Sequence, residues 1–167
     1  DVEREGIDMT KPLGDILAEC FKDWDEEEQF ALPKDAKRGN HCGVQAVAVV
    51  AQKLLGETME IFKAKCSRIK SKKRWAGGTT HPERVKVLKF LGVKFKELNT
   101  SYTNGVTLQR FVKEIANPNF TYIVTTTSHV QLVKGSKILD QQGKVEISDF
   151  WGRRKKIYKP VLQVIKE

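Results

Sequence analysis

The sequence predicts an α+β fold, because apolar residues follow a helical spacing up to about residue 119 and alternating strand patterns follow from residue 120. The chain has 167 residues, enough for one core but too few for two, so a single domain over 1–167 is expected. Hydrophobic residues make up 40% of it and charged residues 31%, a balance typical of globular rather than disordered proteins. No apolar run approaches the roughly 20 residues of a membrane helix, so no membrane partner is expected.

The mainly helical part is expected over 30–119, after an acidic segment at 1–29. Its apolar side chains recur every three or four residues, the spacing of a helix with one buried face. Gly56 and Gly92 follow two of these stripes and are expected to end them. Thr80 stands before His81-Pro82, a pattern typical of a helix start. Helices are therefore expected at 11–22, 43–55, 59–69, 80–91 and 107–116.

The antiparallel β part is expected over 120–167, where short runs of β-branched and aromatic residues are separated by turn residues. Because helices come first and strands follow, a wound βαβ fold is disfavoured. Strands are expected at 120–127, 130–133, 137–139, 144–147 and 157–165, with one more at 93–98 inside the helical part.

Charge is distributed unevenly along the chain. Residues 1–29 hold eleven acids and three bases, a net charge of −8, whereas residues 30–167 hold 27 bases and ten acids, a net charge of +17. A body this basic predicts an acidic partner: a nucleic acid, an acidic protein, or the N-terminal segment itself, docked as a lid or propeptide remnant.

Two basic clusters support this prediction, and a solubilising surface is their simpler interpretation. Trp75, beside the first cluster, could stack on a base, although Trp is more often partly buried in a core. The first cluster is Lys63, Lys65, Arg68, Lys70, Lys72, Lys73 and Arg74, and the second is Arg153, Arg154, Lys155 and Lys156.

The three cysteines, Cys20, Cys42 and Cys66, are too few for a disulfide scaffold and indicate a reducing compartment. There is no Cys-x-x-Cys pair, His-rich tract or His-Glu-x-x-His motif, so neither a metal nor another cofactor is expected. Basic neighbours allow a lowered pKa at Cys66. Because Cys66 falls within a predicted helix with no His nearby, it ranks far below Cys42 as a nucleophile.

Cys42 lies where a loop becomes an apolar helix. The first turn of a helix has backbone N–H groups without partners, and their field favours a thiolate. Gly43 allows another segment to approach the sulfur closely. The apolar helix should be buried and central, so that it holds Cys42 rigidly. Cys42 is therefore the candidate nucleophile, with a small buried hydrophobe as the alternative.

The segment 128–140 predicts a β-hairpin with Lys134-Gly135 as its turn, where glycine supplies a positive φ. In that register His129 lies directly opposite Asp140, on the same face of the sheet. A carboxylate beside an imidazole orients the ring and stabilises its protonated form. The prediction depends on the turn, since a slip of one residue would separate the two side chains.

Cys-Gly-x-x-Ala at the head of an apolar helix, a distant His-Val-x-x-Val on a strand and an Asp after a tight turn resemble a papain-like cysteine peptidase. The spacing and short chain are most similar to C39-like peptidases and small phage-encoded relatives. The resemblance implies a papain-like fold, with the Cys-bearing helix packed on the antiparallel sheet, and no cofactor. It implies Cys42 as nucleophile, His129 as general base and acid, and Asp140 as the residue that orients His129. A phage-encoded relative would be located in the host cytoplasm or the virion.

The chain departs from this family at the oxyanion site. Family members usually carry a Gln about six residues before the Cys, where this chain has Ala36. Gln29 is expected to substitute, with Asn40 as the nearer alternative, beside the backbone N–H of Cys42. Loss of one such donor costs about a hundredfold or more in rate. Trp151 resembles the Trp that shields the third catalytic residue in papain, and Asp149 is a fallback for that third role.

The expected function is hydrolysis of a protein or peptide amide through an acyl-enzyme. Deamidases, acyltransferases and isopeptidases use the same triad and stay open as alternatives. The alternative from another class is a basic nucleic-acid-binding or host-protein-interacting phage protein on a catalytically weak papain-like scaffold. Substitution of Cys42 by Ser separates the two, because it should abolish hydrolysis and leave binding unchanged.

Overall fold

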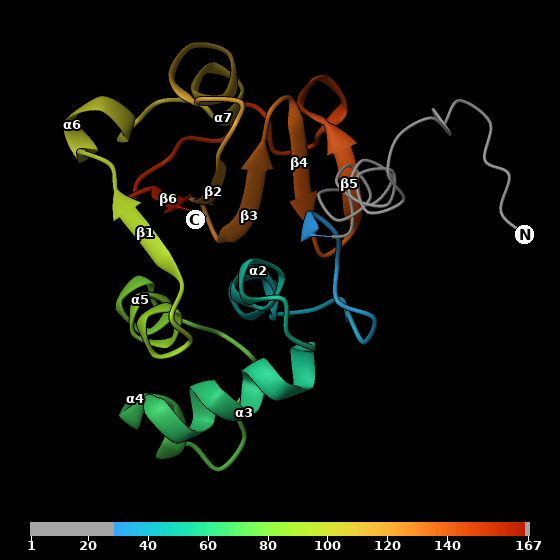
Figure 1. The fold of residues 1–167 in the computed structure, drawn as a ribbon, viewed down its shortest axis with the longest axis vertical. Helices are drawn as coiled ribbons and strands as arrows, with labels where there is room; N and C mark the ends of the chain where they lie inside the picture. Colours follow the sequence, from blue (N-terminus) through green and yellow to red (C-terminus); the bar gives the residue numbers. More distant parts are fainter. Residues whose placement is uncertain (1–28, 166–167) are drawn as a thin grey trace, which may run out of the picture.

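A computed structural model describes residues 29–165 and shows an α+β fold built on one antiparallel sheet (Figure 1). The α+β class predicted from the sequence is confirmed. The sheet has the strand order β1-β6-β2-β3-β4-β5. Its strands are β1 Lys94–Glu97, β2 Thr121–Thr126, β3 His129–Lys134, β4 Lys137–Asp140, β5 Gly143–Glu146 and β6 Leu162–Ile165. The helices are α2 Cys42–Ala51, α3 Leu55–Lys65, α4 Ser67–Lys70, α5 His81–Phe90, α6 Thr100–Thr103 and α7 Leu108–Arg110, with a π-helical turn at Phe111–Ile115 and a 3-10 turn at Ile147–Asp149.

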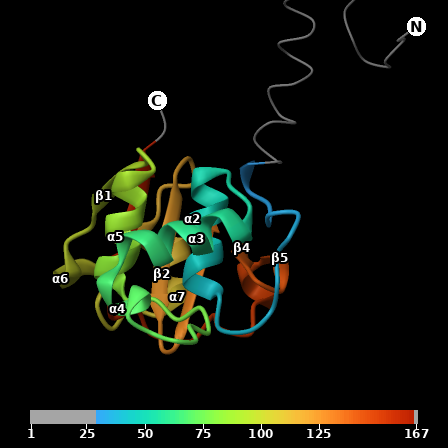
Figure 2. The same ribbon diagram turned by 90° about the horizontal axis from the view of Figure 1, so that it is seen from below.

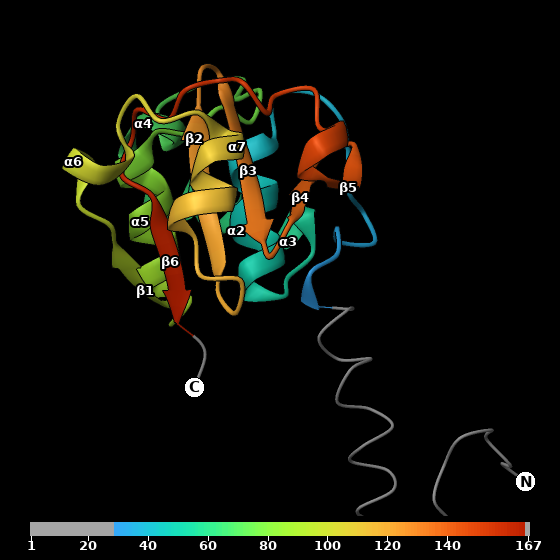
Figure 3. The same cartoon turned by 90° about the horizontal axis from the view of Figure 1, so that it is seen from above.

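Helices cover both faces of the sheet. Helices α2, α3 and α5 lie on one side of the sheet, the side that faces the viewer in Figure 2, and α7 lies on the other (Figure 3). Each side has its own hydrophobic cluster, because alternate residues of a strand point to opposite faces. The cluster on the α2 side includes Val47, Phe62, Leu88, Ile123 and Leu132. The cluster on the α7 side includes Phe111, Tyr122, Val124, Val133 and Ile138.

Helix α2 is shorter than the sequence predicts. It ends at Ala51, and the next residue, Gln52, has a left-handed φ of 56°. The backbone N–H of Gln52 closes the last turn of the helix. Gly56 does not end this helix but lies in the first turn of α3. The carboxylate of Asp35 accepts the N–H groups of Leu55 at 2.7 Å and Gly56 at 2.9 Å. A side chain from the preceding loop therefore caps α3 and ties that loop to the helix.

Helix α5 begins where the sequence predicts. The hydroxyl of Thr80 accepts the N–H of Glu83 at 3.3 Å, and the Glu83 carboxylate accepts the N–H of Thr80 at 2.8 Å, which makes a capping box. The helix predicted at 59–69 is instead divided at Cys66 into α3 and α4. Strand β1, inside the part expected to be mainly helical, pairs with β6 at the other end of the chain. The sheet therefore joins both parts of the chain.

Three sequence predictions fall outside the described residues: the helix at 11–22, Cys20, and the acidic segment up to residue 28. Within 29–165, no helix combines the length and the apolar character needed to cross a membrane.

Candidate active site

Cys42 is the first residue of α2, as the sequence predicts, and its side chain is half-buried. Residues 43–49 behind it are all buried, so the helix is anchored in the core on the α2 side of the sheet. His41, the residue before Cys42, makes no side-chain cap to the start of α2. The field of the unpaired N–H groups of the first turn therefore acts at the position of the thiol.

Gly43 allows a very close contact beside the nucleophile. A Cβ at this position would lie 2.2 Å from Oγ1 of Thr79 and 3.2 Å from Cδ of Arg84. Real Cβ atoms do not approach other atoms this closely, so only glycine fits without a shift of the neighbouring segment. This contact brings the loop before α5 and the side chain of Arg84 to the start of α2. Close approach of another segment to the sulfur itself stays a prediction.

The hairpin of β3 and β4 turns one residue later than the sequence predicts, at Gly135-Ser136, so the predicted register is wrong. Each pairing is shifted by two residues, and Leu132 pairs with Leu139. His129 and Asp140 are therefore not direct partners. A shift of two residues nevertheless keeps both side chains on the same face of the sheet, whereas a shift of one would have separated them. The two residues meet as diagonal neighbours.

The His129 ring links Asp140 to the thiol. Its Nε2 lies 3.1 Å from Oδ2 of Asp140, and only 8% and 6% of the two residues are exposed. Because Nε2 is taken by the carboxylate, Nδ1 is the nitrogen available to Cys42. Asp140 also accepts the N–H of Gln142 at 2.9 Å, which fixes the carboxylate from its other oxygen. The three predicted residues therefore come together from α2, β3 and β4.

The surroundings favour charge on each member of this group. Burial opposes the thiolate, but hydrogen bonding from His129 and from the N–H of Val130, with the charges of His129 and Arg84, lowers the pKa of Cys42 below its ordinary value. Burial also opposes the imidazolium, but Asp140 and Cys42 raise the pKa of His129 to about 9. The pKa of Asp140 is lowered, because interaction with His129 outweighs its burial. These directions support a thiolate–imidazolium pair at neutral pH.

Two aromatic rings cover the imidazole. The ring centroid of Trp151 lies 5.1 Å from that of His129, and the ring of Phe150 lies 6.4 Å away. The indole of Trp151 also hydrogen-bonds the Asp140 carboxylate and helps to lower its pKa. Trp151 therefore lies against both His129 and Asp140. Asp149 is exposed on the 3-10 turn, and Asp140 rather than this fallback contacts His129.

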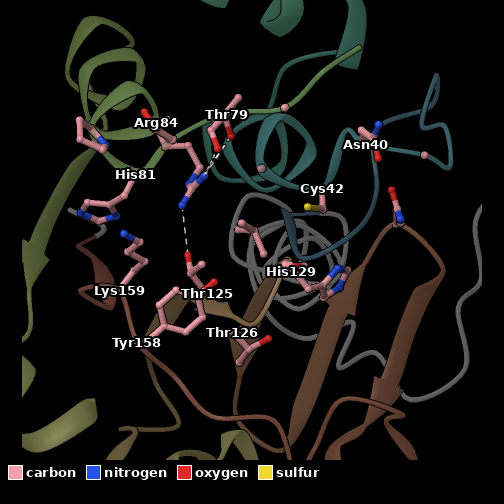
Figure 4. Close-up of a pocket in the computed structure, with 18 residues that line it drawn as sticks. Asn40, Cys42, Thr79, His81, Arg84, Thr125, Thr126, His129, Tyr158 and Lys159 are labelled. Carbon is pink, nitrogen blue, oxygen red and sulfur yellow. Dashed lines mark hydrogen bonds between the residues drawn. The ribbon is translucent and has the colours of Figure 1, made fainter. Parts of the chain in front are cut away.

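Cys42 and His129 line a cavity of about 640 Å³ (Figure 4). Its walls come from the loop before α2, the loop and first turn of α5, the ends of β2 and β3, and residues 158–159. The volume lies in the range of sites that enclose a small ligand or a few residues of a peptide. The reactive groups therefore lie in the wall of a space that a substrate can enter.

The structure separates the two amides expected at the oxyanion site. Gln29 lines a different cavity with Val49 and Gln52, near the far end of α2 and roughly 10 Å along the helix from Cys42. The prediction that Gln29 donates to the oxyanion is therefore wrong, because Gln29 lies near the opposite end of α2 from Cys42. Asn40 lines the same cavity as Cys42 and keeps this role as a prediction.

Two further residues of the cavity wall were missed in the sequence. Gln141 follows Asp140, and its Oε1 is buried without a hydrogen-bond partner among the described residues. Arg84 lies among basic residues that suggest a solvated helix face, yet it is only 3% exposed. A signal was present, because Arg84 precedes the buried Val87 and Leu88 by three and four residues and so shares their face of α5.

Cys66, the second described cysteine, is buried at the junction of α3 and α4. Burial and the nearby carboxylate of Glu83 raise the pKa of its thiol, so the lowered pKa allowed by the sequence is wrong. The basic residues around Cys66 act less strongly than burial, because their charges lie in solvent. Its low rank as a nucleophile agrees with this environment.

The basic clusters are partly engaged in the protein's own contacts. Arg68 binds Glu83 at 2.7 Å, and Lys155 lies 4.7 Å from the centre of the Trp151 ring. Trp75 packs on Phe62 and donates its N–H to a backbone carbonyl, so its ring belongs to the core. Binding of nucleic acid or an acidic protein to the clusters stays a prediction. The exposed members best placed for such a partner are Lys70, Lys72, Lys73, Arg74, Arg154 and Lys156.

Comparison with known proteins found no match among protein-family models, curated proteins or solved structures. The described part of the chain also contains no group of three or more His, Cys, Asp or Glu side chains arranged to hold a metal ion. The geometry of the site is therefore the basis for assigning a function.

Proposed function

We propose that this protein is a papain-like thiol hydrolase that cleaves an amide bond of a protein or peptide. One observation carries the proposal: a half-buried Cys at a helix start, a His held 3.1 Å from a buried Asp, and a cavity beside them. A structural Cys needs neither a lowered pKa nor an imidazole held by a carboxylate. Together these features match what nucleophilic catalysis requires.

In the proposed reaction, the Cys42 thiolate attacks the carbonyl carbon of the amide and forms a C–S bond. The oxygen of the tetrahedral intermediate takes the negative charge near the backbone N–H of Cys42 and the start of α2. His129 then gives its proton to the leaving nitrogen as the C–N bond breaks, which leaves a thioester and a free amine. Water attacks the thioester while His129 accepts its proton, and the C–S bond breaks to release the acid and restore the thiolate–imidazolium pair.

Asp140 is assigned the role of orienting the ring. Its bond to Nε2 turns Nδ1 toward the thiol, and its charge favours the protonated ring that must donate to the leaving group. Trp151 and Phe150 limit the access of water to this ion pair. Weaker access of water keeps the electrostatic interaction between His129 and Asp140 strong.

The first test measures alkylation of each cysteine by iodoacetamide between pH 5 and pH 10, with mass spectrometry of the modified peptides. Cys42 should react at pH 6, far below the pH at which an ordinary thiol reacts, while Cys66 in the same molecule should stay nearly unmodified. Cys42 that reacts only near pH 8.5 to 9, or not at all, would contradict the proposal.

The second test incubates the protein with a library of peptides derived from a whole proteome and identifies new termini. Wild type should generate cuts that the Cys42→Ser variant does not, and intact-mass spectra should show an acyl adduct on Cys42 at short times. Ammonia release without new termini would instead indicate a deamidase. A reactive Cys42 with neither product would contradict hydrolysis while leaving the ion pair intact.

A further inference from the structure

Arg84 is a buried cation in the wall of the candidate active site. It lies on α5 and is only 3% exposed. Within residues 29–165 no carboxylate forms an ion pair with it, and Glu83, the preceding residue, binds Arg68 instead. The Cys42 thiolate acts on Arg84 electrostatically, but it is already paired with His129. A charge removed from water without a partner of its own is costly, so a cation kept in such a place calls for a further compensating partner.

The hydrogen bonds of Arg84 leave part of the guanidinium unused. Nη1 donates to the carbonyl oxygen of Thr79 at 3.1 Å and to its hydroxyl at 3.0 Å, and Nη2 donates to the hydroxyl of Thr125 at 3.2 Å. The Nε atom is buried and has no partner among the described residues. A guanidinium has five N–H groups, so the N–H of Nε and one N–H of Nη2 remain for another acceptor. Neutral oxygens hold the group in place but do not balance its charge.

Apart from the Cys42 thiolate, the charged side chains among the described residues that line the cavity are basic: Arg84, Lys159 and His129. No Asp or Glu is among those lining residues. In Figure 4, the guanidinium of Arg84 lies between Thr79 and Thr125, with Lys159 on one side and Cys42 on the other. Burial lowers the pKa of Arg84 only to about 10, so the group remains charged at neutral pH.

We infer that this cavity binds a carboxylate of the substrate on Arg84, with Lys159 at its rim, and so selects substrates with an acidic group close to the scissile amide. Two parallel N–H groups of a guanidinium match the two oxygens of a carboxylate. The inference rests on the proposed function, since Cys42 supplies the reaction that the bound carboxylate would direct. The carboxylate comes from an acidic side chain or from the C-terminus of the substrate.

The test uses three iodoacetyl probes with one electrophile. Iodoacetyl-glutamine α-amide is neutral, iodoacetyl-glutamate α-amide has a side-chain carboxylate, and iodoacetyl-glutamine has a free α-carboxylate. Second-order rate constants for Cys42 are divided by those of N-acetylcysteine, which corrects for the intrinsic reactivity of each probe. One of the two acidic probes should exceed the neutral probe by about tenfold or more, and its identity names the source of the carboxylate. A ratio near one for both acidic probes would overturn the inference.

Variants separate Arg84 from the general positive charge of the site. Arg84→Gln should bring the ratio close to one, although His129 remains charged, and Arg84→Lys should keep part of the preference. Lys159→Gln, at an exposed position, should lower the ratio by about twofold to threefold even if Arg84→Gln fails to fold. Lys89→Gln is the matched control, because it removes one charge from the exposed face of α5 outside the cavity. The assignment would be contradicted if the ratio of acidic to neutral probe were the same in wild type, in Lys159→Gln and in a folded Arg84→Gln protein.

A separate measurement distinguishes failure of this inference from failure of the proposed function. If Cys42 does not react with the neutral probe, the hydrolase proposal fails, and binding is measured without chemistry. N-acetyl-glutamate α-amide and N-acetyl-glutamine α-amide are then titrated into the ¹⁵N-labelled protein by NMR. Shifts of the amides of Thr79 and Thr125 with the acidic compound alone would support the carboxylate site. Identical responses to both compounds would overturn it.

Discussion

The two described cysteines lie on the same side of the sheet, and their environments act on the thiols in opposite directions. Cys42 begins α2 beside His129, and its pKa is lowered. Cys66 lies in a basic stretch of sequence between α3 and α4, yet burial and Glu83 raise its pKa. Basic neighbours along the chain therefore do not activate a thiol. A thiolate is stabilised where a hydrogen-bonding, cationic partner from a distant strand meets the sulfur and outweighs the cost of burial.

Removal of His129 should have the largest effect on this comparison. In His129→Ala, Cys42 loses the main group that lowers its pKa, so its alkylation at pH 6 should fall toward that of Cys66. Hydrolysis should fall by about a hundredfold or more, since the general acid and base is lost. Alkylation across the pH range measures the first effect, and turnover of any peptide identified in the library measures the second. Cys42 that keeps its reactivity at pH 6 in this variant would show that the helix start alone activates it.

Asp140→Asn should narrow the pH range of activity. The pKa of His129 is about 9 because of Asp140 and Cys42, so activity of the wild type should fall as pH rises through about 9, where the ring loses its proton. Without the carboxylate, the pKa of His129 should drop, and this alkaline fall should move to lower pH. The maximal rate should decrease by about tenfold or more, as the ring loses its fixed orientation. An unchanged alkaline limb would assign that limb to another group.

Gly43→Ala should disturb the packing around Cys42 at the start of α2 and leave the surroundings of Cys66 unaffected. The new methyl group would meet Thr79 and Arg84, and such overpacking costs about 1–3 kcal/mol in the free energy of unfolding. Gly56→Ala is the matched control, because it also lies in a first helical turn but its Cβ would be 3.5 Å from the nearest atom, Oδ2 of Asp35. Urea unfolding measures both. Stability of Gly43→Ala equal to or above that of wild type would show that the neighbouring segment yields at little cost.

Asp35→Ala should have the smallest effect, a modest decrease in the free energy of unfolding. Asp35 connects the region of Cys42 to the region of Cys66. The Asp35 carboxylate ties the loop before Cys42 to the start of the helix that ends at Cys66. Loss of such a cap costs about 1 kcal/mol. The N–H of Gly56 holds the pKa of Asp35 below its ordinary value. The stabilisation by Asp35 is therefore fully present above the pKa that this carboxyl has in the unfolded protein. It is lost as the pH falls through the lower pKa that the carboxyl has in the folded protein. Unfolding free energies of wild type and variant should differ at pH 7 and converge in acid, and a difference independent of pH would point to packing instead.

Local signals in the sequence predicted several features correctly. The start of α5 after Thr80, the start of α2 at Cys42 and the four strands β2 to β5 each depend on residues close together in the chain. Even the wrong hairpin register kept His129 and Asp140 together, because strand residues alternate between faces and the shift was an even number. The candidate triad was therefore predictable from chain-local periodicity combined with the family resemblance.

Contacts between distant segments explain the predictions that were wrong. Gln29 was expected at the oxyanion site, but tertiary packing places it near the far end of α2. Gly56 was expected to end a helix, but Asp35 makes it part of the next one. The local spacing of residues in the sequence predicts neither the position of Gln29 nor that of Gly56.

The sequence by itself therefore determined the α+β class, the candidate nucleophile Cys42 and its two predicted partners, His129 and Asp140, because periodicity and turn chemistry act over a few residues. Only the tertiary structure decided which polar groups surround that nucleophile. Arg84 became a buried cation of the cavity wall because α5 packs its apolar face against the core with the arginine on the same face. The free energy of burying a charge depends on every segment that encloses it, and that enclosure exists only in the folded chain.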